Sequence, residues 1–203
     1  AQDFKQAMEW YQKAASQGHV QAQCNIGCMY YDGRGVPRDF QQAMEWYLKA
    51  ASQGHAEAQF NVGRLFHNGQ GVPQDHKQAV EWYLKAASQG YAEAQHSLGC
   101  LFRDGHGALV AQDFQQAMEW FLKAASQGHA AAHCNVGDMF YSGQGVAQDF
   151  TKAMNWYMKA ASCGHAGAQF GDGRLFHNGQ GVSQDFKQAM EWYLKAVAQG
   201  HAD

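Results

Sequence analysis

Six tryptophans recur at nearly constant intervals, and this repetition constrains the fold more than any other feature of the sequence. They are Trp10, Trp46, Trp82, Trp120, Trp156 and Trp192. The successive spacings are 36, 36, 38, 36 and 36 residues, and the longer interval contains a two-residue insertion near Ala108 and Leu109. A period near 36 is typical of architectures in which one supersecondary unit stacks on the next. The sequence therefore predicts one quasi-linear array of repeats.

Each repeat has the pattern of two helices joined by a glycine-rich loop. In the first full repeat, residues 20–31 and residues 39–52 both carry apolar side chains at helical spacing. Asp39 is suited to cap the second helix, and Gly54 is suited to follow it in the left-handed conformation. No segment alternates apolar and polar residues as a strand does, so we predict an all-α fold of helix-turn-helix repeats.

The motifs within the repeat resemble those of the Sel1-like repeat, a relative of the tetratricopeptide repeat. They are A-x-x-x-I-G-x-x-Y at 22–30, G-x-G-V at 33–36, and A-M-E-W-Y-x-K-A-A-x-x-G at 43–54. The resemblance extends over essentially the whole chain and implies a right-handed α/α superhelix, or solenoid. Members of this family are mostly non-catalytic adaptors that hold other proteins together, so the resemblance implies a scaffold that binds a protein or peptide.

The repeat period divides the 203 residues into a single array. We expect a half repeat, then five full repeats, then the first residues of another repeat. The boundaries are 1–17, 18–53, 54–89, 90–127, 128–163, 164–199 and 200–203. Because the sequence opens inside one repeat and closes where another would begin, we expect it to be a piece of a longer protein.

Charge and composition weigh against several classes of function. The net charge is −3, without the basic excess that marks nucleic-acid binding proteins. No apolar run is long enough to insert across a bilayer. The five cysteines do not recur once per repeat, which argues against a disulfide framework and favours a reducing compartment, so we expect a cytoplasmic protein. They are Cys24, Cys28, Cys100, Cys134 and Cys163.

Comparison of the copies with one another locates candidate binding residues. The second helix is nearly the same in every copy, whereas the first helix varies at positions i, i+3, i+7 and i+10. At about 100° per residue these positions form one stripe roughly 80° wide. In tetratricopeptide arrays, which this repeat resembles, the corresponding stripe lines a concave groove. The predicted protein-binding residues are Gln21, Cys24, Cys28, Tyr31, Glu57, Phe60, Arg64, His67, Glu93, His96, Cys100, Arg103, Cys134, Asp138, Tyr141, Phe170, Arg174 and His177.

The residue types of this stripe favour a binding surface. It mixes Phe, Tyr, Arg and His, and interfaces are enriched in aromatic side chains and arginine. Phe60 and Phe170 are otherwise unexplained on a surface. Two alternatives stay open: solvent-exposed positions that are free to vary, and a structural spacer or array that associates end to end.

Catalytic, metal and phosphate sites have weaker support. Cys24 with Cys28, and His96 with Cys100, have the i,i+4 spacing that can chelate zinc, but no copy supplies three or four ligands locally. The G-x-G loops follow a helix and lack the third glycine of a dinucleotide fingerprint. No motif combines a nucleophile, a base and an orienting group. We therefore predict no catalytic residue, no metal, no cofactor and no enzyme activity; a metal-dependent or hydrolytic protein is the third alternative.

Several recurring residues predict how the repeats pack. We expect the tryptophans to be core residues, and Glu45 with Lys49 to form an i,i+4 ion pair. A glycine inside the first helix of every copy costs roughly 1 kcal/mol relative to alanine, which predicts close approach of the helices there. These glycines are Gly27, Gly63, Gly99, Gly137 and Gly173. The histidine of the recurring Gln-Gly-His motif is predicted to pack or cap, with Tyr91 as the one exception.

The last first-helix differs from its equivalents. It has additional glycines at Gly167 and Gly171, and it has Asp172 where the other copies have Ile or another aliphatic residue. A carboxylate at an aliphatic core position is destabilising unless it is hydrogen-bonded or protonated. We therefore expect residues 164–181 to be the least stable part of the interior, either through drift in a redundant copy or as a flexible joint.

Overall fold

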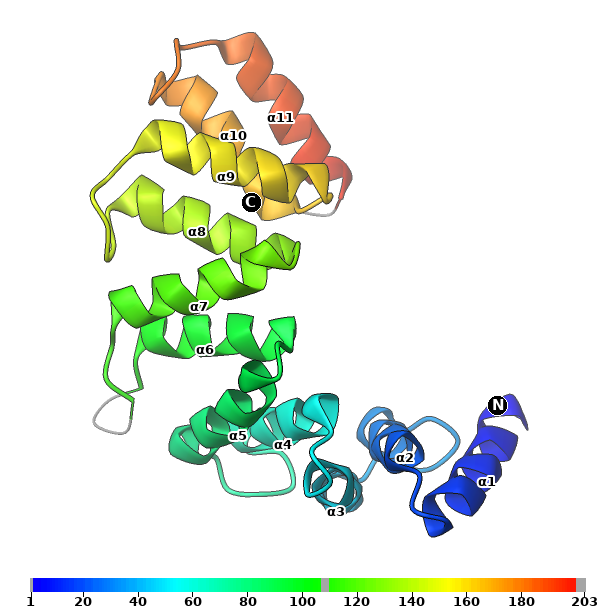
Figure 1. Cartoon of the computed structure of the whole chain (residues 1–203). Helices are drawn as coiled ribbons and strands as arrows, with labels where there is room; N and C mark the ends of the chain where they lie inside the picture. Colours follow the sequence, from blue (N-terminus) through cyan, green and yellow to red (C-terminus); the bar gives the residue numbers. More distant parts are fainter. Residues whose placement is uncertain (1, 107–109, 200–203) are drawn as a thin grey trace. The chain divides into compact units, whose positions relative to one another are not determined.

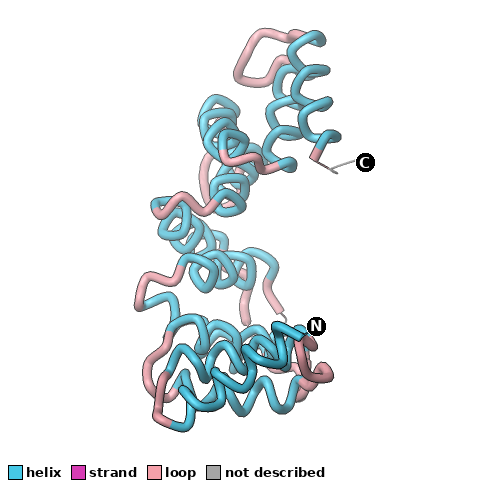
Figure 2. Tube along the Cα trace, turned by 90° about the vertical axis from the view of Figure 1, so that its right-hand side faces the viewer, coloured by secondary structure: helices cyan, strands magenta, loops and turns pink. Residues whose placement is uncertain are grey.

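The computed structural model describes residues 2–106 and 110–199, and all regular structure in these residues is helical (Figures 1 and 2). This confirms the all-α prediction. None of the described helices is long and apolar enough to cross a membrane. The eleven helices within the described residues are α1 (Gln2–Ser16), α2 (Val20–Asp32), α3 (Phe40–Ala51), α4 (Ala56–Asn68), α5 (His76–Ser88), α6 (Ala92–Asp104), α7 (Phe114–Ser126), α8 (Ala130–Ser142), α9 (Phe150–Ser162), α10 (Ala166–Asn178) and α11 (Phe186–Ala198). We call the even-numbered helices A helices and the odd-numbered ones B helices.

The helix ends lie where local sequence signals place them. Asp39 precedes α3, and its carboxylate accepts hydrogen bonds from the backbone N–H groups of Gln41 and Gln42, at 2.9 and 3.0 Å. Gly54 follows α3 with a φ of 87°, in the left-handed region that favours glycine. The A helix α4 begins at a different cap, in which His55 Nδ1 accepts from a backbone N–H. His129 and His165 cap α8 and α10 in the same way.

The described residues fall into two compact units. One comprises residues 2–94 with 106 and 110, and the other comprises residues 95–105 with 111–199. Within the first unit α1 to α5 pack in chain order, and within the second unit α7 to α11 do the same. Helices α2, α4, α8 and α10 each pack most extensively on the B helix of their own repeat, so the helical hairpin is the building block of both units.

Inside each hairpin the two helices meet where a glycine faces an aromatic ring. A Cβ atom on Gly27 would lie 2.6 Å from Cδ1 of Tyr47, and one on Gly63 would lie equally close to Tyr83. The other pairs are Gly99 with Phe121, Gly137 with Tyr157, and Gly173 with Tyr193. The predicted close approach is confirmed, because the space of one absent methyl group is filled by a ring of the partner helix.

The tryptophans lie at the edge of the core and not at its centre, so the prediction that they are core residues is confirmed only in part. Four of them pack against the buried clusters: Trp46, Trp82, Trp156 and Trp192. Trp46 and its counterparts in the later B helices are half-buried, and Trp10 is 68% exposed. The buried aromatic residue of α3 is the next one, Tyr47, which points about 100° away around the helix. The sequence predicted an ion pair between Lys49 and Glu45. Instead, the ammonium of Lys49 lies over the ring of Trp46, 4.0 Å from its centre. The same lysine–tryptophan contact recurs in α1, α5, α7, α9 and α11.

A second recurring contact joins the start of each A helix to the end of the B helix in the same hairpin. The side chain of Gln53 donates a hydrogen bond to that of Gln23 at 2.8 Å. The equivalent pairs Gln89–Gln59 and Gln127–Gln95 have the same length. The acceptor glutamines are buried, so the bond satisfies a polar group inside the hairpin. Cys163 and His133 occupy the next pair of equivalent positions, where the glutamine series is interrupted.

The last described helix exposes the face that earlier B helices bury. Met44 in α3 is 6% exposed because α4 covers it, whereas the equivalent Met190 in α11 is 58% exposed. Phe186, Leu194 and Val197 continue this apolar face along α11. The comparison shows that the following A helix is what completes the core of each B helix.

Candidate protein-binding surface

In the first unit, side chains of the stripe contact one another between neighbouring A helices. The guanidinium of Arg64 lies over the ring of Tyr31 at 4.2 Å and near the ring of Phe60 at 6.0 Å. The hydroxyl of Tyr31 donates to the side chain of Gln70 at 3.0 Å, and its ring packs edge-on against Phe40. These contacts hold the rings and the guanidinium in defined positions.

The second unit repeats the same arrangement. Arg174 lies over Tyr141 at 3.8 Å, and Tyr141 donates to Gln180 at 3.0 Å while packing against Phe150. Phe170 packs against Tyr193 with ring centres 5.3 Å apart. The same stacking of an arginine on the tyrosine of the preceding A helix therefore occurs once among the described residues of each unit.

Polar contacts replace this stacking at α6. Arg103 donates to Asn135 at 3.1 Å and forms an ion pair with Asp104 at 2.7 Å. Asn135 also contacts His96 at 2.9 Å, and the thiol of Cys100 lies 3.7 Å from the same imidazole. The hydrogen bond to Asp104 is the largest influence that raises the pKa of Arg103, so its charge is secure. The stripe residues here are occupied by contacts within the protein.

Asp138 of α8 contributes an acidic group to the stripe of the second unit. The hydroxyl of Tyr157 donates to its carboxylate at 2.7 Å. Desolvation raises the pKa of Asp138, and this effect is opposed by the Tyr157 hydroxyl and by Arg174. The residue itself is exposed, so its carboxylate is open to a binding partner.

Two of the predicted binding residues lie in the core. Cys24 is fully buried and Cys134 is 7% exposed, and each packs within a cluster of apolar side chains. A thiol behaves as a small apolar group. These positions are buried because their clusters include apolar side chains of the next A helix, Val62 beside Cys24 and Leu175 beside Cys134. The prediction of a partner contact was wrong at both. The other predicted residues are exposed or half-buried.

The stripe lines a hollow of about 250 Å³ in the first unit. The rings of Phe60 and Tyr83 are 5.5 Å apart, and those of Phe60 and Tyr91 are 5.4 Å apart. The hollow therefore combines aromatic faces with the guanidinium of Arg64. Its lining residues are Cys28, Tyr31, Asp32, Tyr47, Glu57, Phe60, Asn61, Arg64 and Tyr91.

Tyr91 is the lining residue that the stripe pattern misses. It belongs to the loop before α6, and its sequence position is the one where the recurring histidine of the Gln-Gly-His motif is replaced. That exception is the signal that marks it. Burial is the main influence that raises the pKa of Tyr91 to about 12, so the side chain is a neutral hydroxyl that can donate or accept a hydrogen bond.

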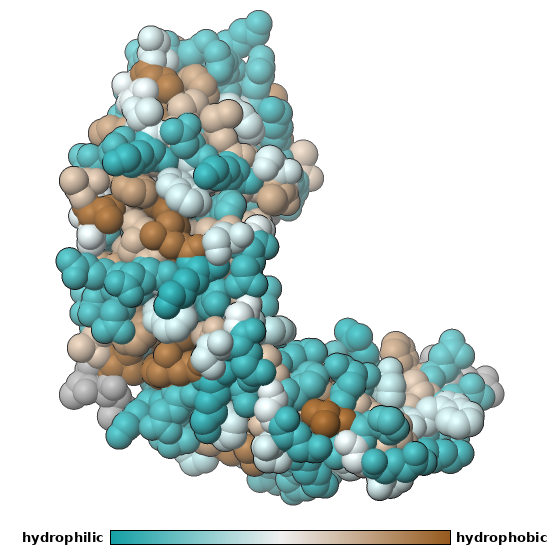
Figure 3. Space-filling view, in the orientation of Figure 1, coloured by the Kyte–Doolittle hydropathy of each residue, from teal (hydrophilic) through white to brown (hydrophobic). Residues whose placement is uncertain are grey.

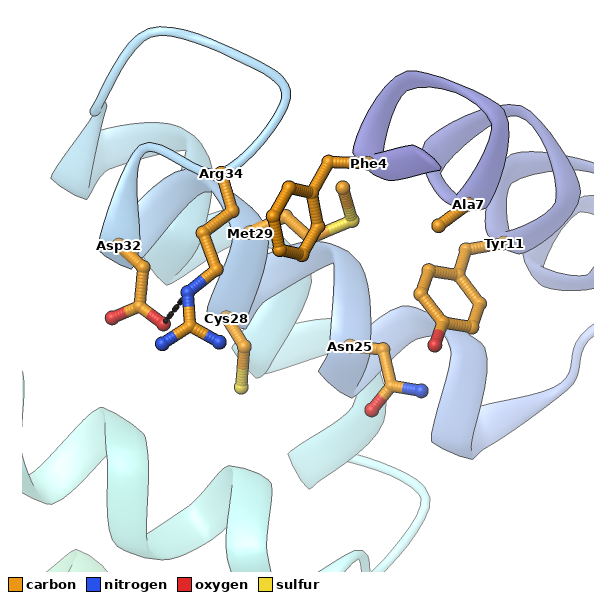
Figure 4. A pocket seen from close by; sticks show the side chains of 8 residues that line it. All are labelled: Phe4, Ala7, Tyr11, Asn25, Cys28, Met29, Asp32 and Arg34. Carbon is orange, nitrogen blue, oxygen red and sulfur yellow. Dashed lines mark ion pairs between the residues drawn. The ribbon is translucent and has the colours of Figure 1, made fainter. Parts of the chain in front are cut away.

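A second hollow of about 210 Å³ lies between α1 and α2 (Figure 4). Phe4 and Tyr11 project into it from α1, and Arg34 forms an ion pair with Asp32 at 3.2 Å on its other side. Cys28 and Asp32 line both hollows. On the face drawn in Figure 3, hydrophilic residues predominate and hydrophobic ones form small separate patches.

Cys28 and Cys24 influence each other's ionisation. A hydrogen bond from Cys24 is the largest influence on Cys28 and lowers its pKa to about 7, against the opposing effect of desolvation. The hydroxyl of Tyr47 also donates to Cys28, at 3.4 Å. The same bond and burial raise the pKa of Cys24 far above its usual range. Of the two thiols, Cys28 is therefore the more acidic, and Cys24 is the one that keeps its proton.

One group of potential metal ligands lies beside this hollow. Ligand atoms of Cys24, His55 and Glu57 are all within 4.8 Å of one another. However, His55 uses Nδ1 to cap α4 and Nε2 to contact Gln21 at 3.0 Å. The thiol of Cys24 is held in its neutral form, whereas a metal binds the thiolate. These residues fit a helix cap better than a metal site.

Stacked helical hairpins with an extended variable stripe define an α-solenoid repeat protein. The Sel1 repeat family matches six consecutive segments of the sequence, and the chain belongs to this family. The matched residues are 1–19, 20–55, 56–91, 92–129, 130–165 and 166–201. Sel1 repeat proteins are generally non-enzymatic scaffolds for protein interaction. No curated protein matches the chain.

Solved structures of other Sel1 repeat proteins share the fold. A protective antigen of uropathogenic Escherichia coli strains is 36% identical with a TM-score of 0.90, covering 99% of this chain. This chain spans only 43% of that antigen's length. A Sel1 repeat protein from Oxalobacter formigenes is 34% identical with a TM-score of 0.91, covering 98% of this chain and 79% of its own. An immunity protein from Pseudomonas aeruginosa is 25% identical with a TM-score of 0.62. The match covers 94% of this chain and 72% of the immunity protein.

Proposed function

We propose that this chain is a scaffold that binds a protein or peptide along the A-helix stripe, with the hollow around Phe60, Arg64 and Tyr91 as the main anchoring point. The hollow carries the proposal, because it brings stacked aromatic faces and a guanidinium together in one recess. Aromatic and arginine side chains in partly enclosed positions are those that dominate binding energy at interfaces.

The side chains of the hollow are already ordered. Arg64 is held over Tyr31, and Phe60 is held by Tyr83 and Tyr91. A partner would not have to immobilise these long side chains, a step that costs about 0.5–1.5 kcal/mol for each. The binding surface is therefore pre-organised.

The chemistry of the hollow indicates what a partner would present. The Nε atom of Arg64 is buried without a hydrogen-bond partner in the described part of the chain. A carbonyl or carboxylate oxygen from a partner would satisfy that donor. The rings of Phe60 and Tyr91 would cover an apolar side chain next to it. We therefore expect an apolar residue adjacent to an oxygen-bearing group in the bound segment.

The comparison with known structures supports a protein partner. One neighbour in structure is named as an immunity protein, and the family consists generally of protein-interaction scaffolds. By analogy we expect the chain to act through binding and not through catalysis.

A peptide library selected on the immobilised chain tests the proposal. Selected peptides should bind the Phe60→Ala/Arg64→Ala variant at least about ten-fold more weakly, since removal of such anchors costs more than 1 kcal/mol each. A control variant, Leu48→Ala/Leu84→Ala, removes exposed apolar side chains from α3 and α5 and should bind as the wild type does. Circular dichroism checks that both variants stay helical. Equal affinity for all three proteins would show that the hollow is not the binding site.

A further inference from the structure

Helices α8 and α10 of the second unit carry counterparts of the contacts that order the hollow around Arg64. The guanidinium of Arg174 lies over the ring of Tyr141 at 3.8 Å, and Phe170 packs against Tyr193 with ring centres 5.3 Å apart. All four residues belong to the same compact unit. By their position in the repeat, the equivalents of Tyr31, Phe60 and Arg64 are Tyr141, Phe170 and Arg174.

The same hydrogen-bond donor is left unsatisfied in both units. The Nε atom of Arg174 is buried without a hydrogen-bond partner in the described part of the chain, and so is the Nε atom of Arg64. A buried donor without an acceptor is costly, and native structures contain few of them. Its recurrence at equivalent positions indicates that the acceptor comes from outside the chain. An oxygen atom of a bound segment would supply it.

The second unit differs at the position of Cys28, where it has Asp138. The hydroxyl of Tyr47 donates to Cys28 at 3.4 Å. At the equivalent place the hydroxyl of Tyr157 donates to Asp138 at 2.7 Å, so the two residues have the same neighbour within the protein. Asp138 is exposed, and its charge interacts with that of Arg174. A carboxylate accepts several hydrogen bonds, so Asp138 can accept another from a ligand.

The acidic groups of the first hollow are replaced in the second unit. Asp32 and Glu57 line the first hollow, and the residues at their positions in the second unit are Ser142 and Gly167. Asp138 is the only acidic residue among the second-unit positions that correspond to the lining of the first hollow. The acceptor for a ligand therefore lies on the A helix that precedes Arg174, and not on the helix of Arg174 itself.

We propose that the second unit holds a second binding site, formed by Asp138, Phe170 and Arg174, which takes an apolar side chain next to the carboxamide of an asparagine or glutamine. Arg174 would donate to the carboxamide oxygen, Asp138 would accept from its NH₂ group, and the ring of Phe170 would cover the apolar side chain. A carboxamide suits this pair of residues because it carries an acceptor and two donors in one planar group. The inference rests on the proposed function, since it assumes that the A-helix stripe binds peptide segments.

Two sites of different specificity would let one chain hold two different segments. The first site is expected to take an oxygen-bearing group, either a carbonyl or a carboxylate. The second site discriminates against a carboxylate, because a ligand's negative charge would lie beside Asp138, and like charges placed together at an interface are strongly disfavoured. Binding of two unlike segments is the property by which a scaffold connects two proteins.

Peptide selection on a chain without the first site tests the proposal. Phe60→Ala/Arg64→Ala leaves the second site, and a random peptide library selected on this variant should yield peptides with asparagine or glutamine beside an apolar residue. Their affinity should fall at least about ten-fold when Phe170→Ala/Arg174→Ala is added. Circular dichroism checks that the variants stay helical.

A matched control removes exposed apolar side chains from the B helices of the same unit. Leu122→Ala/Met158→Ala alters α7 and α9, where these side chains are 40% and 49% exposed. This change, made in the chain without the first site, should leave the affinity of the selected peptides as it was.

Asp138→Cys tests the specificity without altering α10. It introduces the residue that the first unit has at this place, so the variant should fold. Changing the peptide's asparagine to aspartate keeps the shape and one oxygen, but it removes the donors and adds a negative charge. We expect this change to weaken binding at least about ten-fold when Asp138 is present, and to have a clearly smaller effect on Asp138→Cys.

Three results would overturn the proposal. They are no selected peptide on the chain without the first site, unchanged affinity on adding Phe170→Ala/Arg174→Ala, and an equal cost of the asparagine-to-aspartate change with and without Asp138. If Phe170→Ala/Arg174→Ala loses its helicity, the comparison on Asp138→Cys decides alone. The proposed function fails by a different result, which is that peptides selected on the wild type bind independently of Phe60 and Arg64.

Discussion

Helices α4 and α10 are nearly the same in sequence and lie in different units, so they form an internal comparison. Each has 13 residues, a histidine N-cap and a glycine at its C-cap. They differ only at Glu57/Gly167, Asn61/Gly171 and Val62/Asp172. Both nonetheless form one uninterrupted helix with the same boundaries within their repeats. The caps and the shared packing residues therefore determine the backbone, and the three substitutions change the stability of the helix more than its shape.

The most consequential difference lies in the core. Val62 and Asp172 are both fully buried. Val62 packs in an apolar cluster, whereas neither carboxylate oxygen of Asp172 has a hydrogen-bond partner in the described part of the chain. Desolvation raises the pKa of Asp172 to about 7, against a smaller opposing effect of Lys195. The same position therefore carries a stabilising apolar side chain in α4 and, in α10, a buried carboxyl group that becomes charged as the pH rises.

The largest expected effect is that of Asp172→Val, which gives α10 the residue of α4. A rise in pKa from 3.8 to about 7 corresponds to about 4 kcal/mol of lost stability at pH 8, and this loss should be recovered. Amide hydrogen exchange in residues 166–178 should slow accordingly. Exchange is the suitable measurement because the repeats of an array can unfold separately, and it gives the stability of each helix.

The reciprocal change Val62→Asp is the matched control. It should destabilise α4 by a similar amount and speed the exchange of residues 56–68. If Asp172→Val leaves the exchange of α10 unchanged, the carboxylate has a partner or a water molecule that compensates its burial.

A pH dependence of comparable size should distinguish the two helices. The folded state binds the Asp172 proton more tightly than the unfolded state, so the part of its destabilising effect that comes from ionisation is absent below about pH 4. Stability of the α10 region should fall as the pH rises from about 4 to about 7 and should then level off. Exchange of α10, corrected for its intrinsic pH dependence, should follow this profile in the wild type and lose it in Asp172→Val.

A smaller effect concerns the glycine that faces an aromatic ring. Gly63→Ala places a Cβ atom 2.6 Å from the ring of Tyr83, which is 2% exposed and enclosed on all sides. We expect a loss of roughly 1–3 kcal/mol, as for other overpacked cores. Gly173→Ala meets Tyr193 at 2.5 Å, but this ring is half-buried on α11 and has room to move, so its cost should be lower. Urea denaturation of the two variants compares them, and equal losses would show that the ring of Tyr193 is as confined as that of Tyr83.

The smallest expected effect is that of Gly171→Ala. Replacing a glycine within a helix gains up to about 1 kcal/mol. The new Cβ atom would lie 2.9 Å from the ring of Tyr157, however, so the ring must shift and part of the gain is lost. We expect a net change within about 0.5 kcal/mol by urea denaturation. Gly171 is the equivalent of Asn61 in α4. A loss above about 2 kcal/mol would show that the ring of Tyr157 fills the space left by the missing side chain at Gly171 and cannot move out of it.

The sequence sufficed for features that depend on local signals. The repeat period, the aspartate caps and the glycines within A helices each act over a few residues, so the fold class and the hairpin could be predicted. The choice between Trp46 and Tyr47 as the core residue could not, because adjacent positions both border a broad apolar face. Gly27 lacks a side chain opposite Tyr47, but this complementarity becomes visible only when the two helices are brought together.

The candidate sites show the same division. The stripe that lines the hollow follows from helical geometry, whereas Tyr91 and Asn61 enter it from a neighbouring loop and from the adjoining helix face. Cys24 belongs to the stripe by helical geometry, but it is buried because it packs with Val62 and Leu65 of the next A helix, a contact between repeats that the pattern of one helix does not reveal. The second site unites residues of two A helices, and the unsatisfied donor of Arg174 becomes visible only when those helices are packed together.

The glycine–ring contact and the glutamine pair, both within the hairpin, have a consequence for how such a chain can evolve. Both contacts are the same in successive copies, so a duplicated 36-residue segment would bring with it everything that holds its own two helices together. Arrays of this type can therefore lengthen or shorten by recombination between copies without new packing inside the hairpin. The hairpin that contains His133 and Cys163 has lost the glutamine pair, and this copy is no longer interchangeable with its neighbours.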